Sequence, residues 1–463
     1  MHSARNSRYI AEIADTTTTI FLMACMHQNV ETQADVDTPL RKETSSGRSY
    51  ALAMLSAVAA VSVIDRQVIT ILMQPIKAEF GASDAAMGAL AGLAFAIFYV
   101  IAGFPLARLA DRGVRRTIIA ISLSVWSLFT LLCGFAQSYV HLLLARIGVA
   151  VGESGGMPAT HSMVADLYPL SRRGFAISII GASGSLGSAL GVYLGGELYQ
   201  LYGWRGAFMA LAVPGLILAA IFRLSVREPA RVLPHNNSKD TTPPLREVAS
   251  TLWRIKSFRS FLVGGFGLSF AGVGMLVWAP TFLMRVHHAT PQEAGQMFGL
   301  AVAVGLCGGQ LASGYLADRL GQRDVRWYAW LGGVGAVLAA PFGLGFLFVP
   351  DQMTAMVAFA IYLLLMSCWN VPFLAICLTM APPRTRAMVS ALYVMCVNLG
   401  GIGLGSVFVG AMNDVLTSRY GPEAIRHSLT LVMGVSVLAG LACALASRWL
   451  RDDVRSSALS QDA

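Results

Sequence analysis

Four ionisable residues stand inside long apolar stretches of the sequence and could do chemistry there. Asp65 and Arg66 are adjacent in VIDRQVIT, and no other residue of the range 50–76 is charged. Arg146 and Glu153 share a second apolar stretch, and their spacing of two helical turns places them on nearly the same face of a helix. A carboxylate takes up and releases protons, and a guanidinium pairs with carboxylates and phosphates. The four residues therefore predict a proton-coupling site that also holds an anionic head group.

The elements that must position these residues are membrane-spanning helices. Of the 463 residues, 55% are hydrophobic and 13% are charged, and apolar runs longer than about 18 residues recur along the chain. This pattern predicts an all-α integral membrane protein with about twelve spans. The spans begin near Tyr50, Asp84, Thr117, Tyr139, Phe175, Gly206, Phe261, Ala294, Tyr328, Met353, Met388 and Leu429.

The basic residues gather in the loops of one side. The net charge of +9 comes mostly from cations that follow the even-numbered spans, such as Arg115, Arg173 and Arg323. Cytoplasmic loops are rich in such cations, so both termini are expected in the cytoplasm. The protein is expected in the plasma (inner) membrane. The charge therefore reports topology, and no nucleic-acid partner is expected.

The charged residues within the spans are costly unless they are paired. Asp65 and Glu153 lie about 15 and 14 residues into oppositely directed spans, so both reach mid-depth. Each such charge costs about 2.5 to 3.5 kcal/mol, and four unpaired charges would cost on the order of 10 kcal/mol. We therefore expect acid–base pairs that face an aqueous cavity. A purely structural ion-pair network is the alternative interpretation.

An acid in such a cavity can couple protons to a conformational change. Burial favours the neutral form of a carboxylic acid, and a neighbouring guanidinium favours the ionised form. This balance changes when the cavity alternates sides. An acid that is protonated on one side and ionised on the other then converts a proton gradient into a conformational bias.

The sequence contains an internal repeat. ARLADRGVRR (107–116) follows the second span, and GYLADRLGQR (314–323) follows the eighth. We therefore expect two pseudo-symmetric six-helix bundles, 49–224 and 260–450, joined by a cytoplasmic linker, 225–259. A cytoplasmic, disordered tail, 1–48, precedes them, and a short cytoplasmic tail, 451–463, follows.

The repeated motif supplies a candidate cytoplasmic gate. Asp111 and Asp318 occupy matching positions, and carboxylates there can bind helix N-termini or arginines and so latch the halves together. The alternative is that the nearby arginines serve only as topology determinants. The full candidate gate consists of Asp111, Arg112, Arg115, Asp166, Asp318 and Arg319.

The seventh and tenth spans carry no charge, unlike the first and fourth. Their distinctive residues suggest an apolar wall that faces the charged wall of the first half, an arrangement that suits an amphipathic substrate. Packing or lipid contact is the alternative for each aromatic residue. The candidate wall residues are Trp278, Met366, Trp369, Asn370 and Phe373.

The repeated motif resembles the signature of the major facilitator superfamily, G-x-x-x-D-R-x-G-R-R. The second copy departs from it at Gln322, and the first at Ala107 and Val114. Within that superfamily, the stretches 64–80, 103–116 and 142–169 resemble the spinster branch. This resemblance implies twelve helices in two bundles and proton-coupled movement, by alternating access, of lipids such as sphingosine phosphate or lysophospholipids. It also implies that glycine-rich spans two, five, eight and eleven meet between the halves.

Several other function classes are less consistent with the sequence. A symporter of small organic anions would also place arginines in the cavity, and a non-transporting membrane sensor is a third possibility. No nucleophile elbow, metal-ligand cluster or Gly-Lys-Ser/Thr nucleotide loop occurs. We expect a monomeric transporter whose partners are protons, membrane lipids and an amphipathic lipid substrate. We expect no enzyme activity, no cofactor and no metal.

Overall fold

The computed structural model describes residues 45–229, 250, 252–381 and 385–462. Within these ranges some residues, Asp111 and Arg112 among them, are described by their backbone alone. Most of the expected tail 1–48 and linker 225–259 therefore lies outside the described residues. The described residues from Tyr50 onward belong to one compact unit.

The described residues form helices and no strands. The helices of the first half are α2 (Ser45–Phe80), α3 (Asp84–Gly88), η1 (Ala89–Leu93), α4 (Ala94–Arg112), α5 (Arg115–Gly134), α6 (Tyr139–Glu153), α7 (Gly156–Leu167) and α8 (Leu170–Ser225). Those of the second half are α10 (Lys256–Val286), α11 (Pro291–Val302), η2 (Ala303–Cys307), α12 (Gly308–Gly321), α13 (Arg326–Phe348), α14 (Gln352–Met366), η3 (Ser367–Trp369), α15 (Asn370–Thr379), α16 (Arg386–Asn398), η5 (Leu399–Gly405), α17 (Ser406–Tyr420), η6 (Gly421–Glu423) and α18 (Ala424–Asp462).

Capping side chains fix several helix starts close to the predicted span starts. Ser83 accepts a hydrogen bond from Ala86 N at the start of α3, and Asp351 caps α14 in the same way. Thr290 and Glu293 form a capping box at α11, where Pro291 occupies the first turn. Such side chains satisfy backbone N–H groups that have no partner within the helix.

Several helices are interrupted where the sequence predicted continuous spans. The fourth span breaks into α6 and α7 directly after Glu153, and the tenth contains the 3-10 turn η3 between α14 and α15. The segments η1, η2 and η5 are π-helical. Within α8, Gly203 has φ +67°, a conformation that glycine adopts easily, and it marks the turn between the fifth and sixth expected spans.

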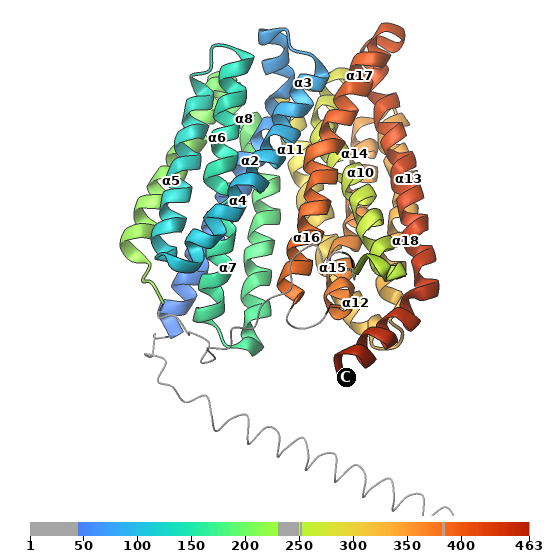
Figure 1. The fold of residues 1–463 in the computed structure, drawn as a ribbon. Coiled ribbons are helices and arrows are strands. Elements are labelled where there is room, and N and C mark those ends of the chain that lie inside the picture. The colour runs from blue at the N-terminus through green and yellow to red at the C-terminus, as the bar shows by residue number, and fades with distance from the viewer. Residues whose placement is uncertain (1–44, 230–249, 251, 382–384, 463) are drawn as a thin grey trace, which may run out of the picture. The chain divides into compact units, whose positions relative to one another are not determined.

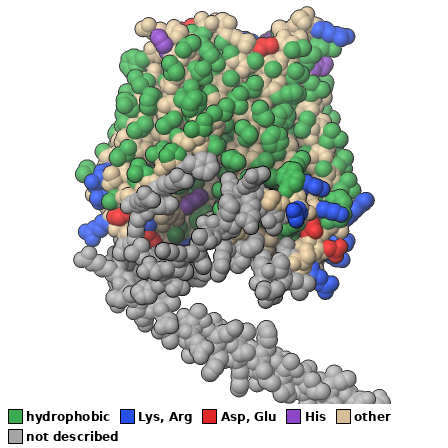
Figure 2. Space-filling model, viewed as in Figure 1, with side chains coloured by type: hydrophobic (Ala, Val, Ile, Leu, Met, Phe, Trp, Pro, Cys, Tyr) green, Lys and Arg blue, Asp and Glu red, His purple; other side chains and the backbone are tan. Residues whose placement is uncertain are grey.

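The apolar surface fits a lipid environment. Figure 2 shows hydrophobic side chains over much of the visible face, with most of the visible Lys and Arg toward its lower end. Leu224, Leu311 and Leu438 are each at least 70% exposed, which would be costly in water over so large a surface. Nine of the described helical segments are long and apolar enough to cross a membrane.

The two halves meet through helices that approach each other closely. Figure 1 shows α5, α6 and α7 on one side and α13, α16 and α18 on the other, while α3 contacts α17 and α8 contacts α11. A Cβ on Gly92 would lie 1.9 Å from the Ile402 carbonyl oxygen, and a Cβ on Gly196 would lie 2.7 Å from the Pro291 carbonyl oxygen. The expected meeting of spans two, five, eight and eleven is therefore observed.

Candidate functional site

The four charged residues of the first half lie together. Asp65 and Arg66 come from α2, and Arg146 and Glu153 come from α6. Arg66 Nη2 forms an ion pair with Glu153 Oε1, and the Ser62 hydroxyl donates to the same oxygen. Asp65, Arg146 and Glu153 are at most 2% exposed, whereas the Arg66 side chain is 25% exposed. Arg66 is therefore the member of this cluster most open to a ligand.

The Asp65 carboxylate and the Arg146 guanidinium do not form the ion pair that the sequence predicted. Arg146 Nη1 donates to the backbone carbonyl oxygen of Asp65 at 3.1 Å. The Asp65 carboxylate instead accepts a hydrogen bond from the Thr130 hydroxyl at 3.3 Å. The pairing is thus observed for Arg66 with Glu153, while among the described residues the Asp65 carboxylate has no cation in hydrogen-bonding contact.

The cluster contains buried polar atoms that lack hydrogen-bond partners among the described residues. They are Asp65 Oδ1, Glu153 Oε2, Arg66 Nε, and Arg146 Nε and Nη2. Buried polar groups are nearly always satisfied, so a group of exceptions calls for a functional or solvent explanation. Together these atoms offer both acceptors and donors to a proton, a water molecule or a polar ligand.

Two aromatic side chains of α4 complete this part of the site. The Arg66 guanidinium lies 4.8 Å from the ring centre of Phe95 and 5.7 Å from that of Tyr99. The Arg146 guanidinium lies 5.8 Å from the Phe95 ring centre. These rings hold the cations by cation–π attraction. Neither ring was predicted as part of the site, although their spacing of one helical turn is visible in the sequence.

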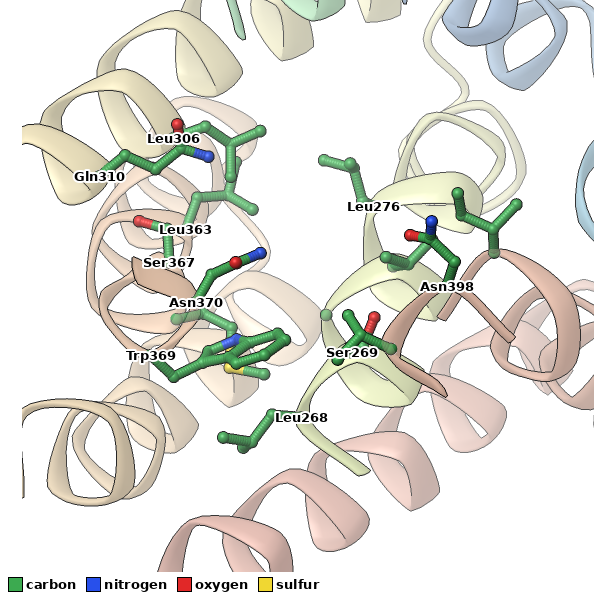
Figure 3. A pocket seen from close by; sticks show the side chains of 15 residues that line it. Leu268, Ser269, Leu276, Leu306, Gln310, Leu363, Ser367, Trp369, Asn370 and Asn398 are labelled. Atoms are coloured by element: carbon green, nitrogen blue, oxygen red, sulfur yellow. The ribbon is translucent and has the colours of Figure 1, made fainter. Parts of the chain in front are cut away.

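A cavity of about 190 Å³ opens in the second half. Met366, Trp369 and Asn370, three of the expected wall residues, line it (Figure 3). Its other lining residues include apolar side chains and several polar ones that the sequence analysis did not single out. These polar residues are Ser269, Gln310, Ser367 and Asn398.

The other two expected wall residues pack away from this cavity. Trp278 is 1% exposed and donates from Nε1 to the Ser406 carbonyl oxygen at 2.8 Å. Phe373 is fully buried, with its ring centre 4.8 Å from that of Phe261 and 6.0 Å from that of Trp369. In this structure both residues serve helix packing, the alternative that the sequence had left open.

The expected gate residues form contacts within each half at the end of the bundle where α5 begins. Arg115 forms an ion pair with Asp166, and Arg115 Nε also donates to Glu228 Oε1 at 2.8 Å. Glu228, which the sequence analysis did not single out, further accepts from the Arg115 and Arg116 backbone N–H groups. This arrangement ties the start of α5 to the chain that follows α8.

The second half has a comparable ion pair at the same end of the bundle. Arg451 on α18 donates to both carboxylate oxygens of Asp324, at 3.2 and 2.5 Å. These hydrogen bonds hold the pKa of Asp324 below its usual range. Asp318 is exposed and has no ion pair among the described residues, and Arg319 donates to the Tyr315 hydroxyl at 2.5 Å. The side chains of Asp111 and Arg112 lie outside the described residues.

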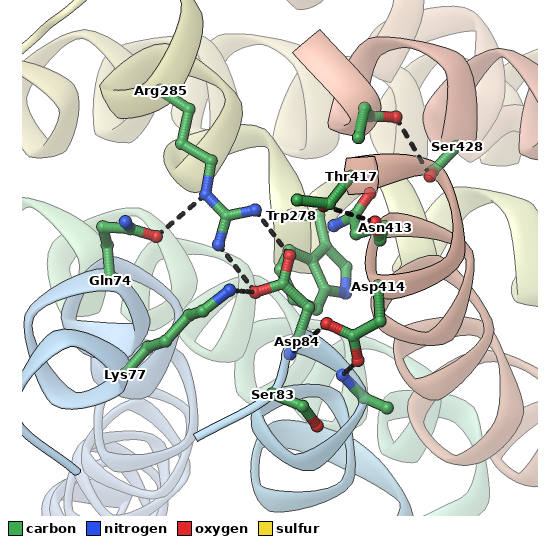
Figure 4. A network of polar contacts seen from close by, with 12 residues as sticks. Gln74, Lys77, Ser83, Asp84, Trp278, Arg285, Asn413, Asp414, Thr417 and Ser428 are labelled. Atoms are coloured by element: carbon green, nitrogen blue, oxygen red, sulfur yellow. Dashed lines mark hydrogen bonds and ion pairs between the residues drawn. The ribbon is translucent and has the colours of Figure 1, made fainter. Parts of the chain in front are cut away.

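A buried network joins the halves at the opposite end, where α3 begins (Figure 4). Asp84 is fully buried and forms ion pairs with Lys77 and with Arg285, whose Nη1 and Nη2 donate at 2.5 and 2.7 Å. The Asp414 carboxylate on α17 accepts from the backbone N–H groups of Asp84 and Ala85, both at 2.8 Å. We call these contacts the Asp84 network, and they were not predicted from the sequence.

The sequence and the fold are similar to those of known proteins. The family model described as Major Facilitator Superfamily matches residues 55–405. An "MFS-type efflux pump" of Mycolicibacterium smegmatis is 32% identical over 91% of this chain and 98% of its own. A "Probable L-galactonate transporter" of Escherichia coli is 25% identical over 71% of this chain and 76% of its own.

A solved structure is similar over almost the whole fold. It is a bacterial homologue of the human lysosomal transporter spinster, in an inward-facing and unoccupied conformation. It is 29% identical, covers 89% of this chain and 99% of its own, and has a TM-score of 0.81. The resemblance to the spinster branch inferred from the sequence is thus confirmed.

Proposed function

Because the chain belongs to the Major Facilitator Superfamily, we propose that it is a proton-coupled secondary transporter that moves an amphipathic lipid by alternating access. It is an integral, multi-pass membrane protein and a transporter, and the expectation that it is not an enzyme is confirmed. The proposed cargo is a lysophospholipid or a lipid similar to sphingosine phosphate. The proposed setting is the plasma (inner) membrane, with the protein acting as a monomer.

The proposed topology has twelve spans in two bundles, 49–224 and 260–450, with both termini in the cytoplasm. The long segments Arg172–Ser225 and Met388–Ser456 each exceed the roughly 20 residues of one crossing. The interrupted helices α6 and α7 together supply a further crossing. The Arg115 end would then be cytoplasmic and the Asp84 end external, so the present structure would be an inward-facing form.

The observation that carries the proposal is the buried charged cluster with its unpartnered carboxylate and guanidinium atoms. Asp65 and Glu153 would bind and release the coupling proton, and the partly exposed Arg66 would pair with an anionic head group. A guanidinium fork pairs well with phosphate, and a dry environment strengthens the pairing. Protonation of Glu153 would weaken its bond to Arg66 and so free Arg66 for the substrate.

The cavity of the second half supports an amphipathic cargo over a small anion. Its lining combines apolar residues such as Leu268, Leu276 and Met366 with uncharged polar ones, and none of the fifteen lining residues is charged. An anion held from both halves would be expected to meet a cation on this wall as well. An apolar chain beside a polar group fits the lining better.

Binding is expected to depend on acyl chain length. Each buried CH₂ contributes about 0.8 kcal/mol, so affinity should rise about fourfold per methylene until the cavity is filled. A calorimetric series of lysophospholipids that differ only in chain length measures this rise. Arg66→Ala should weaken head-group binding, and Trp369→Ala should flatten the chain-length dependence. Arg205→Ala, at a surface ion pair with Glu79, is the control and should change neither.

Affinity that does not change with acyl chain length would favour the second candidate function, and unchanged head-group binding by Arg66→Ala would rule out Arg66 as the head-group ligand. That candidate is a proton-coupled symporter of small organic anions. It is favoured by the similarity to the relative named as an L-galactonate transporter. The amides of the cavity could also bind the hydroxyl groups of such an anion.

Asp318→Asn is expected to shift the protein toward the inward-open form. Asp318 is exposed and unpaired among the described residues in this form, so the latch that we propose for it would stabilise the outward-open form only. A gate contact at an exposed site contributes about 1 kcal/mol or less, a population change of up to about fivefold. Distances between spin labels on the cytoplasmic ends of spans two and eight should lengthen. They should not lengthen in Asp452→Asn, which removes another exposed acid at that end, and equal distances in all three proteins would rule out the latch.

A further inference from the structure

Three amide side chains face the cavity of the second half from three different helices (Figure 3). Gln310 lies on α12, Asn370 is the first residue of α15, and Asn398 is the last residue of α16. Gln310 and Asn370 extend into the cavity from one side, and Asn398 faces them from the other. We call these residues the amide triad.

Breaks in the helices place two of the three amides. Asn370 directly follows the 3-10 turn η3, and Asn398 directly precedes the π-helical segment η5. Irregular backbone at membrane depth is tolerated where it lines a cavity, and π-helical segments occur frequently at functional sites. The backbone irregularities of the tenth and eleventh spans thus coincide with the polar part of the cavity.

The hydrogen-bonding capacity of the triad is largely unused by the protein. Neither Asn370 nor Asn398 forms a side-chain hydrogen bond to another described residue. Gln310 Oε1 accepts from the Ser185 hydroxyl of α8 at 3.0 Å, which leaves its NH₂ group to donate into the cavity. The nearby Ser367 hydroxyl, in contrast, donates to the Leu364 carbonyl oxygen at 3.1 Å.

The triad therefore presents both donors and acceptors and no net charge. Each amide carries two N–H donors and a carbonyl acceptor. A phosphate or carboxylate would bind the donors but would be repelled by the acceptor oxygens of Asn370 and Asn398. A hydroxyl or amide group can use both, and leaving these groups unpaired against an apolar ligand would be costly.

We propose that Gln310, Asn370 and Asn398 form a subsite for an uncharged hydroxyl or amide group of the substrate. The proposal rests on the proposed function, in which Arg66 binds the charged head group. The amide triad then selects, among amphiphiles of equal charge and chain length, those that carry an uncharged hydroxyl or amide group. Gln310 also contacts Ser185 of the first half, so a ligand at this subsite touches a residue that bridges the two halves.

The test compares two probes that differ in a single group. One is a lysophosphatidic acid with its free glycerol hydroxyl, and the other is the analogue in which hydrogen replaces that hydroxyl. Binding of each is measured by calorimetry on the full chain in detergent, for wild type, Asn370→Leu, Asn398→Leu and the control Thr379→Ala, which changes a residue of α15 that does not line the cavity. L-galactonate, a hydroxylated anion without an acyl chain, is a third probe. If a leucine variant does not fold, the alanine variant at that position replaces it.

Wild type is expected to prefer the hydroxyl-bearing lipid by about tenfold, in line with one to two hydrogen bonds. Each leucine variant should reduce that preference about three- to tenfold without weakening the deoxy lipid, and Thr379→Ala should leave the preference intact because that hydroxyl donates to the Ala375 carbonyl oxygen of its own helix. Equal binding of the two lipids by wild type, or equal weakening of both by the variants, overturns the subsite.

The remaining outcomes separate the subsite from the lipid proposal. If only L-galactonate binds and the asparagine variants weaken it, the subsite is supported and the lipid function is overturned. If only L-galactonate binds and the variants leave its affinity unchanged, or if no probe binds wild type, both proposals are overturned.

Discussion

Asp65→Asn and Glu153→Gln, made separately, are expected to leave a folded protein that no longer accumulates substrate in response to a proton gradient. Each change removes a titrating carboxyl group and nearly preserves its shape. The new amides can still accept the hydrogen bonds from Thr130 and Ser62 that the carboxylates accept in the structure. One proton moving through 100 mV carries about 2.3 kcal/mol, which supports an accumulation of roughly 50-fold. Both variants should reduce that ratio to about one.

The measurement is substrate accumulation in proteoliposomes, with thermal unfolding as the test of folding. Glu79→Gln is the matched control, because it removes a carboxylate from the same helix, α2, at a partly exposed ion pair with Arg205. It should accumulate substrate as wild type does. Full gradient-driven accumulation by either Asp65→Asn or Glu153→Gln would rule out that residue as a coupling group.

Asp84→Ala is expected to open the end of the bundle that the Asp84 network closes. The change leaves Arg285 and Lys77, whose side chains are 12% and 29% exposed, without their shared carboxylate. Removing one partner of a buried ion pair costs about 3 to 5 kcal/mol, or about two to four powers of ten in the equilibrium between forms. The form seen here should therefore cease to dominate.

Spin labels at Gln137→Cys and Ser418→Cys report on this end, because both positions are exposed and lie in opposite halves. Their separation should lengthen in Asp84→Ala. Glu423→Ala removes an ion pair with Arg426 at the same end but within one half, and it should leave the separation unchanged. An unchanged separation of the labels in Asp84→Ala would contradict this prediction. It would show that the close helix contacts at glycines keep this end closed without the Asp84 network.

The charged cluster was largely predictable from the sequence, because depth along a helix follows from residue counting. Asp65 and Glu153 were expected at one level, and the structure joins Glu153 to Arg66. The partner of Asp65 was not predictable. It depends on the rotation of α5, which brings Thr130 to the Asp65 carboxylate, and on the approach of Arg146 to a backbone carbonyl rather than a side chain.

The wall of the second half was only partly predictable. The tenth span is apolar on all faces, so its composition carries no periodic signal for the side that meets a cavity. Met366, Trp369 and Asn370 face the cavity, whereas Phe373 packs on Phe261. Asn370 and Phe373 both follow the turn η3 on α15, and nothing in a single sequence marks a 3-10 turn of three residues.

The Asp84 network could not be predicted from the sequence, for a different reason. Asp84 and Arg285 are 201 positions apart and belong to different halves. In the sequence each is an isolated charge at the end of an apolar stretch, where solvation is the usual outcome. Only the packing of α3 against α17 buries Asp84 and makes the pairing necessary.

The most direct test of the central claim is transport of labelled lysophospholipids and sphingolipids in proteoliposomes, with and without an imposed pH gradient. We expect movement of at least one of these lipids that is driven by the gradient, is absent from liposomes without protein and is lost in Asp65→Asn. Transport of every lipid at the rate of protein-free liposomes, or transport that is unaffected by the pH gradient, would contradict the account.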